Sequence, residues 1–227
     1  MELHFDQELT QTKDMLMRMS SLAEQAVAAA LKGLVQRDDD FAHRVLDGDT
    51  PLDILQKQID ERCVELVALR QPKARDLRFL IVLMKIAAEL ERVGDQAVNI
   101  SHRTLALNRE PQLKPFVDIP RMAELSCGMI HTVLDAFVYG KLDVARQVIQ
   151  TDPEVDRLES QLDRELTSFM IEDPHTITRA LNLIGVAHSL KRIGDHAVNI
   201  AEEVVYLYEG RDIRHQSANP QEDRKVG

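Results

Sequence analysis

The sequence predicts an all-α protein made of two tandem three-helix bundles, related by an internal repeat. The composition favours helix, because Leu, Ala, Val and Glu are abundant while only nine Gly and eight Pro interrupt 227 residues. Apolar residues recur at helical spacing over long stretches. Residues 90–100 and 190–200 are identical at eight of eleven positions, where unrelated segments would share about one. The last observation predicts that one unit occurs twice.

Turn signals divide the first half into helices. A break at Asp47-Gly48-Asp49 precedes Thr50-Pro51, which is typical of an N-cap followed by Pro in the first turn. Gln71-Pro72 marks the next turn. The predicted helices cover residues 5–37, 38–46, 51–70 and from the turn to 108.

The second half repeats this order. We expect helices to end at Gly140, to restart after Asp152-Pro153 and to turn at Asp173-Pro174. The predicted helices cover residues 121–139, 141–150, 153–171 and 176–208. The predicted organisation is a first bundle at 1–110, a linker at 111–120, a second bundle at 121–210 and a polar tail at 211–227.

Charge and cysteine usage narrow the function classes. The net charge of −10 opposes binding to DNA, RNA or anionic lipid. The two cysteines form no CxxC pair, which fits a reducing compartment. The first twenty residues lack an apolar run, and no stretch is apolar enough to span a bilayer. We therefore expect a cytoplasmic protein that meets a membrane only through its partners.

Each half carries a strip of oxygen-bearing side chains next to its apolar stripe, because residues four apart share a helix face. Carboxylates and amides suit Mg²⁺, Mn²⁺, Ca²⁺ or iron better than structural zinc, and the pattern does not distinguish these cations. The predicted metal ligands are Asp53, Asp60, Glu91, Asp95 and Asn99 in the first half, and Asp156, Asp163, Asp195, Asn199 and Glu202 in the second.

A purely structural interpretation of the strips stays open. Arg92 and Arg192 could neutralise the acids, and Gly94 and Gly194 could allow helices to approach closely despite their cost of about 1 kcal/mol. A lone helical histidine such as His196 is more often a packing or surface residue than a ligand. No nucleophile with an oriented base and no Gly-rich phosphate loop is present, so catalysis is not expected.

Several motifs closely resemble the PhoU family of bacterial phosphate-uptake regulators. They are Glu-Leu-Glu-Arg-Val-Gly-Asp at 89–95, Arg-Gln-Pro at 70–72, Asp-Leu-Arg at 76–78 and Arg-Ile-Gly-Asp-His-Ala-Val-Asn-Ile at 192–200. The resemblance covers nearly the whole chain and extends to residues 206–215. It implies two three-helix bundles, frequent homodimers and, in some members, metal clusters bound through ExxxD motifs. Lys191 departs from the family's usual Glu, which puts the second metal site in doubt.

The resemblance also implies a cytoplasmic negative regulator of the phosphate-starvation response. Such proteins connect the ATPase side of a phosphate ABC transporter to a sensor histidine kinase. The alternative is a metal store or oxidase of the ferritin-like kind, but that centre requires ExxH pairs on helices, which this sequence lacks. A third interpretation is a structural bundle whose acids form only a solvated face.

Overall fold

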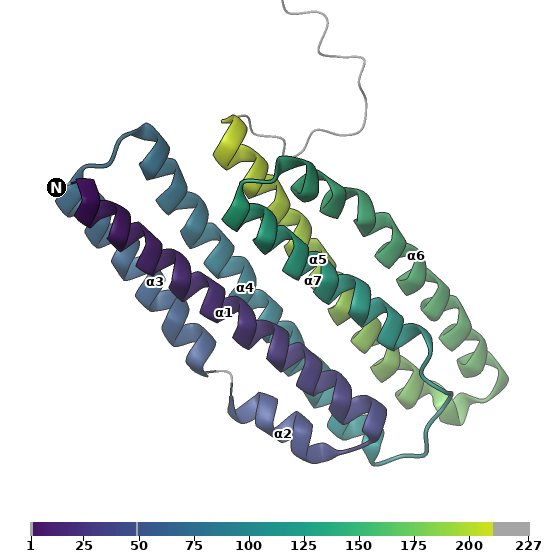
Figure 1. The fold of residues 1–227 in the computed structure, drawn as a ribbon. Coiled ribbons are helices and arrows are strands. Elements are labelled where there is room, and N and C mark those ends of the chain that lie inside the picture. The colour runs from purple at the N-terminus through teal and green to yellow at the C-terminus, as the bar shows by residue number, and fades with distance from the viewer. Residues whose placement is uncertain (1, 49, 211–227) are drawn as a thin grey trace, which may run out of the picture.

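The computed structural model describes residues 2–48 and 50–210, and it confirms the all-α class and the repeated three-helix arrangement (Figure 1). Within this part of the chain, seven α-helices and one 3₁₀ helix follow one another. They are α1 (Glu2–Gln36), α2 (Asp39–Asp47), α3 (Thr50–Arg70), α4 (Ala74–Asn108), α5 (Asp118–Tyr139), α6 (Leu142–Glu172), η1 (Pro174–Thr176) and α7 (Ile177–Glu209).

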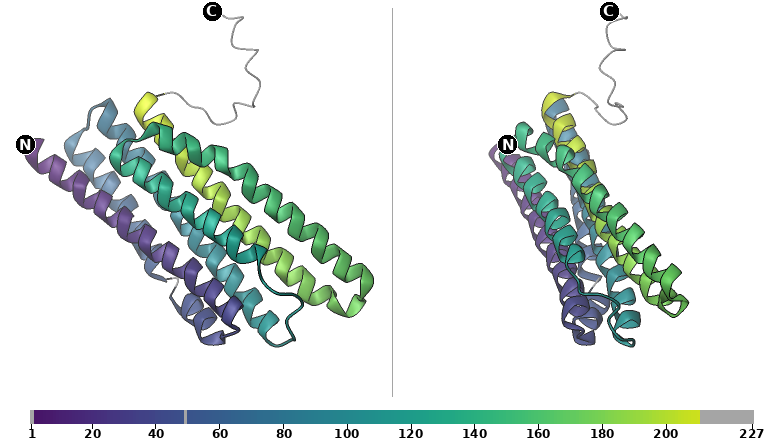
Figure 2. Two further views of the ribbon diagram at one scale, coloured as in Figure 1. Left: turned by 45° about the vertical axis from the view of Figure 1, so that its right-hand side comes forward. Right: turned by 90° about the vertical axis from the view of Figure 1, so that its right-hand side faces the viewer.

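Two groups of three long helices lie side by side. Helices α1, α3 and α4 form one group, and α5, α6 and α7 form the other, all along one common direction (Figure 2). Short connections make successive helices run in opposite directions. Helix α4 packs against α7 between the groups, and the two run antiparallel (Figure 1). The two copies of the signature helix therefore lie against each other.

One continuous apolar core runs through both halves. Its fully buried side chains include Leu16 and Ile86 in the first half, and Phe137 and Ile200 in the second. The ring of Phe79 on α4 stacks on Phe137 of α5, with ring centroids 5.5 Å apart. The two halves share this core, so the core does not divide the chain into two separate domains. The division into two domains stays a prediction.

Local chemistry explains several helix ends. The Asp38 carboxylate accepts a hydrogen bond from the Asp40 amide and caps α2. Asp173 caps η1 in the same way at His175. Helices α5 and α7 end at Gly140 and Gly210, whose φ angles of 68° and 69° lie in the left-handed region that favours glycine.

The predicted break at Asp152-Pro153 is wrong, because α6 runs without interruption from Leu142 to Glu172 with Pro153 inside it. The first half does break at the corresponding place, where Gly48 ends α2. The second half has Thr151 instead of that glycine, and the Thr151 hydroxyl donates to the Gln147 carbonyl within the helix. Buried Val148 and Val155 flank the proline and hold the helix against the core, which offsets the lost backbone hydrogen bond.

The linker is also shorter than predicted. Helix α5 begins at Asp118 rather than 121, and Pro120 occupies the first turn, where a backbone N–H has no helical partner. The predicted polar tail at 211–227 lies outside the described residues. None of the described helices combines the length and apolar character needed to cross a membrane.

Candidate cation and interaction sites

In the second half, Lys191 occupies the centre of the predicted metal strip. Its Nζ lies 2.7 Å from Asp195 Oδ1 on the same helix and 3.8 Å from Asp156 Oδ1 on α6. The position of a metal ion is therefore taken by an ammonium group. Burial would lower the pKa of Lys191, but the hydrogen bond to Asp195 and the surrounding acids raise it overall. This strip does not fit a divalent cation.

A third aspartate faces the same ammonium. Burial, together with Asp156 and Asp195, raises the pKa of Asp152, while Lys191 opposes this effect. Asp152 Oδ1 is buried without a hydrogen-bond partner. An added Cβ at Gly194 would lie 3.6 Å from that oxygen, an ordinary van der Waals contact, so the carboxylate packs beside α7 without requiring the glycine.

The first half has no lysine at the equivalent position. Glu91 and Asp53 are half-buried, and Asp95 and Asn99 are exposed. Neither Asp53 nor Asp95 forms an ion pair with a basic side chain in the described part of the molecule. The Asn99 amide donates to Gln96 Oε1 at 3.4 Å. This strip keeps its negative charge and differs chemically from its counterpart.

The remaining predicted ligands lie apart from these groups. Asp60 and Asp163 are half-buried on α3 and α6, seven residues after Asp53 and Asp156. Burial raises the pKa of Asp60. Glu202 is half-buried on α7. Across the described residues, no three His, Cys, Asp or Glu side chains gather closely enough to hold a metal ion. The predicted metal ligands therefore remain a prediction for the first strip.

A second polar cluster links the two halves between α4 and α7. Glu89 Oε2 lies 2.7 Å from His196 Nδ1 and accepts a hydrogen bond from Asn199 Nδ2 at 3.0 Å. Arg92 donates to Glu89 Oε1 at 2.7 Å. Burial would raise the pKa of Glu89, but the hydrogen bonds from His196 and Asn199 and the electrostatic effects of His196 and Arg92 together lower it. Asn199 thus binds a carboxylate of the other half.

Sequence reasoning missed Glu89 as a partner of the second half. The available signal was the difference between Gln96 and His196 inside an otherwise nearly identical signature. When a titratable side chain occurs in just one of the two copies, it indicates a contact that the other copy lacks. One further interhelical ion pair, in which Lys85 Nζ donates to both carboxylate oxygens of Glu203 at 2.9 and 3.0 Å, also joins α4 to α7.

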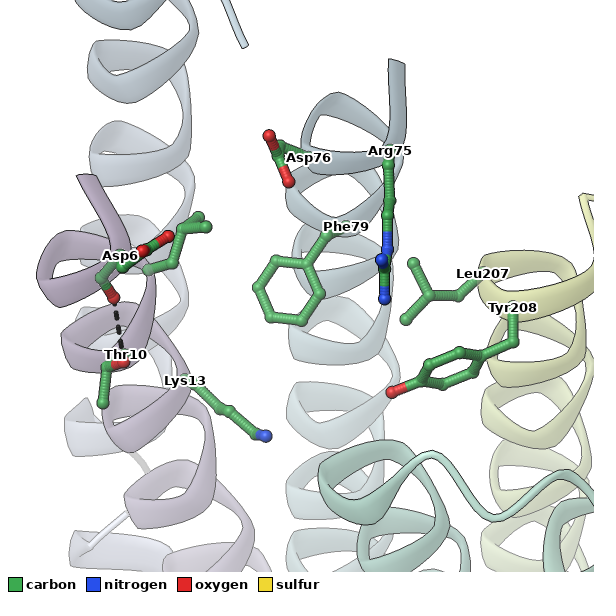
Figure 3. Close-up of a pocket in the computed structure, with 9 residues that line it drawn as sticks. Asp6, Thr10, Lys13, Arg75, Asp76, Phe79, Leu207 and Tyr208 are labelled. Atoms are coloured by element: carbon green, nitrogen blue, oxygen red, sulfur yellow. Dashed lines mark hydrogen bonds between the residues drawn. The ribbon is translucent and has the colours of Figure 1, made fainter. Parts of the chain in front are cut away.

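A pocket lies at one end of the molecule where α1, α4 and α7 meet (Figure 3). We call it the end pocket, and its volume is about 350 Å³. The ring of Phe79 and the side chain of Leu207 form apolar parts of its wall (Figure 3). Its lining residues are Asp6, Leu9, Thr10, Lys13, Arg75, Asp76, Phe79, Leu207 and Tyr208. Asp76 belongs to the Asp-Leu-Arg motif at 76–78. The end pocket therefore contains one of the motifs that resemble the PhoU family, and this motif is not part of either strip.

Two side chains of the end pocket also contact α5. Lys13 Nζ donates to the Val138 carbonyl at 2.8 Å, and the Tyr208 hydroxyl donates to the Phe137 carbonyl at 3.2 Å. Burial lowers the pKa of Lys13, against the opposing effect of Asp14, and burial raises the pKa of Tyr208. The pocket is thus built from both halves of the chain.

Comparison with known proteins now decides the family. The sequence profile of the PhoU domain matches residues 16–104 and matches again at residues 119–204. The chain belongs to the PhoU family. The two matches fall on the two halves of the structure, as the internal repeat predicts.

Relatives of the PhoU family align over most of their length. The chain is 40% identical to the phosphate-specific transport system accessory protein PhoU homolog of Aquifex aeolicus, over 92% of this chain and 95% of that protein. It is 36% identical to the accessory protein PhoU of Escherichia coli K12, over 93% and 88% respectively.

Two crystal structures share the PhoU fold. The PhoU structure from Pseudomonas aeruginosa superposes with a TM-score of 0.88 at 38% identity, covering 91% of this chain and all of that one. The phosphate transport system regulatory protein PhoU from Streptococcus pneumoniae gives 0.86 at 28% identity, covering 92% and 99%.

Proposed function

We propose that this PhoU-family chain is a cytoplasmic negative regulator of the phosphate-starvation response and of phosphate transport. In this proposal it acts as an adaptor between the ATPase subunit of a phosphate ABC transporter and a sensor histidine kinase. The observation that carries the proposal is the alignment of nearly the full chain with proteins named as accessory to the phosphate-specific transport system. Homodimer formation is part of the same proposal.

The unequal strips support an adaptor role. An adaptor must offer different surfaces to different partners, and a repeated fold supplies two similar frames for that purpose. Here the first half presents Asp53 and Asp95 without basic partners in the described structure, while Lys191 partly offsets the negative charge of the aspartates in the second half. The first strip suits a cation or a basic partner surface. The second strip suits these two kinds of partner less well than the first does.

The state of the nucleophilic groups supports a protein without catalysis. Burial raises the pKa of Cys63 to about 12 and that of Cys127 to about 11, so both side chains are thiols near neutral pH. Nδ1 of His196 contacts Glu89, and its Nε2 is buried without a hydrogen-bond partner.

In this proposal a resident cation would lie on the first strip, whose carboxylates do not converge closely enough in the described structure to hold it and would have to move together to ligate it. Asp53, Glu91 and Asp95 would supply carboxylate oxygens, which hard cations such as Mg²⁺, Mn²⁺, Ca²⁺ or iron prefer. Elemental analysis of protein purified without chelator tests this point. We expect Asp95→Asn to lower the metal content and Asp195→Asn to leave it unchanged. Equal metal content in both variants would contradict the assignment.

A strain that lacks the gene tests the regulatory role. At high phosphate, we expect that strain to express alkaline phosphatase constitutively, and the wild-type gene on a plasmid to restore repression. Normal phosphate-dependent repression in the deletion strain would refute the proposal. No observation favours the ferritin-like alternative, since the described residues hold no carboxylate and histidine group of the required kind.

A further inference from the structure

Helix α6 directs most of its acidic side chains at its neighbours and leaves two arginines on its outer face. The helix lies at the outer edge of the second group, where it packs on α5 and α7 (Figure 1). Four of its carboxylates contact basic side chains of other segments, in the pairs Glu154 with Arg121, Asp156 with Lys191, Glu159 with His188 and Glu165 with Lys114. Arg157 and Arg164 are exposed instead.

The guanidinium groups of Arg157 and Arg164 have no carboxylate partner among the described residues. Arg157 Nε donates to the Pro153 carbonyl at 3.1 Å, which directs this group along the helix surface and leaves its two terminal nitrogens without a partner there. A guanidinium presents its donors in a planar fork that matches a carboxylate. Both arginines are therefore available to an anionic group from outside the chain.

A shallow groove of about 580 Å³ runs between these arginines and α5. Arg121 of α5 also lines the groove, and its side chain is 61% exposed, so it can contact a ligand even though it donates to Glu154 at 3.1 Å. Arg157 and Arg164 are seven residues apart, so they share one face of α6 and lie roughly 10 Å apart along it. The exposed side chains of Ser160 and Gln161 line the groove between them. The groove is basic although the chain as a whole is acidic.

The internal repeat shows that this basic face belongs to the second half alone. A shift of 103 residues aligns buried positions of α3 with buried positions of α6, namely Leu52, Leu55, Ile59 and Cys63 with Val155, Leu158, Leu162 and Leu166. The same shift places Ile54 at the position of Arg157, and Glu61 at that of Arg164. Ile54 and Glu61 are exposed on α3. The helical frame therefore accepts apolar and acidic side chains at these positions and does not require arginine.

Charge complementarity indicates an acidic peptide segment as the occupant. The net charge of −10 repels nucleic acid and anionic membranes, whose negative charge extends far beyond a groove of this size. A short acidic segment concentrates its charge in the groove itself. Its carboxylates need to be roughly 10 Å apart to meet both arginines, which is the spacing of residues seven apart on a helix or three apart on an extended strand.

We propose that the groove between α5 and α6 binds an acidic segment of a protein partner, with Arg157 and Arg164 each pairing with a carboxylate of that segment. Arg121 borders the segment from α5. The inference rests on the adaptor proposal only for the existence of a protein partner. Binding by the purified chain can fail while a deletion strain still loses repression, so the two proposals are tested separately.

Fluorescence anisotropy of a fluorescein-labelled octaglutamate peptide, titrated with the full-length chain at low ionic strength, tests the groove. The groove variant carries Arg157→Ile with Arg164→Glu, which are the residues that the repeat has at the equivalent positions of α3. The matched control carries Arg18→Ile with Lys57→Glu, an equal change of charge at exposed positions of α1 and α3. We expect the groove variant to bind about ten-fold more weakly than the wild type and the control to stay within about two-fold of it.

Photo-cross-linking provides a second measurement on the unmodified chain. We expect octaglutamate with a benzophenone group to label residues 154–164 and 121. A groove variant that binds no more weakly than the control, or labelling centred outside these residues, would overturn the proposal.

Two other occupants would also overturn the proposal. Tighter binding of an oligonucleotide of equal charge than of octaglutamate would assign the groove to nucleic acid. Sedimentation would detect a dimer, and a dimer that is lost in the groove variant and kept in the control would assign the groove to a second copy of the chain.

Discussion

Replacing Glu89 with alanine removes one buried polar link between the two halves. The Glu89 side chain is 13% exposed and accepts hydrogen bonds from three residues. Its partner His196 has a side chain that is 5% exposed. In Glu89→Ala, Nδ1 of His196 loses its hydrogen-bond partner. Nε2 of His196 already has no partner among the described residues, so the whole ring is then left without one. A buried polar group without a partner is costly, so we expect a clear loss of stability.

The size of the loss follows from the three contacts. The buried bond between Glu89 and His196 involves a charged acceptor and contributes about 1.5–3 kcal/mol. The bond from exposed Asn199 adds about 0.5–1 kcal/mol. Arg92 is 55% exposed, so its ion pair contributes at most about 1 kcal/mol after solvent screening. We expect Glu89→Ala to lower the free energy of unfolding by about 2–5 kcal/mol.

Urea denaturation followed by circular dichroism at pH 7 measures this loss, with Arg92→Ala as the matched control for the exposed contact. A double-mutant cycle with His196→Ala isolates the buried pair. The pKa of Glu89 is lowered in the folded state, so its contribution is present above pH 4.5 and disappears as the pH falls through the folded value. The reasoning would be refuted by a loss in Glu89→Ala no larger than that in Arg92→Ala.

Three further predictions concern other parts of the molecule. Lys191→Met should lower the free energy of unfolding at pH 7 by about 1 kcal/mol, because Asp195 loses its cation. The pKa of Lys191 is raised in the folded state, so this contribution is fully present below pH 10.5 and is lost as the pH rises through the folded value. An unchanged urea midpoint would contradict it. Cys63 and Cys127, with pKa values of about 12 and about 11, should react slowly with an aromatic disulfide reagent at pH 8 until urea unfolds the chain; rapid labelling of the native protein would exclude this. Gly140→Ala should cost about 1–2 kcal/mol, because its φ is 68° and the new Cβ would lie 3.2 Å from the Tyr208 ring, and a melting temperature equal to that of the wild type would disprove the strain.

The sequence predicted most helices to within a few residues, because their signals are local. Apolar spacing defines each helix face, and Gly or Pro marks most of the ends. The error at Asp152-Pro153 shows where local signals fail. A proline after a polar residue looks like a helix start, but buried Val148 and Val155 on both sides keep α6 continuous.

By itself, the sequence determined that the chain is a repeated all-helical protein of the PhoU family and that Lys191 makes its two signatures unequal. These features depend on residue types and spacings that can be compared along one chain. Only the tertiary structure decided that Glu89 contacts His196, that Lys191 occupies the centre of the second strip and that the end pocket joins α1, α4 and α7. Glu89 and His196 are 107 residues apart. Contacts at such separations are set by which helix faces pack together, and periodicity within a single helix carries no information about its neighbour.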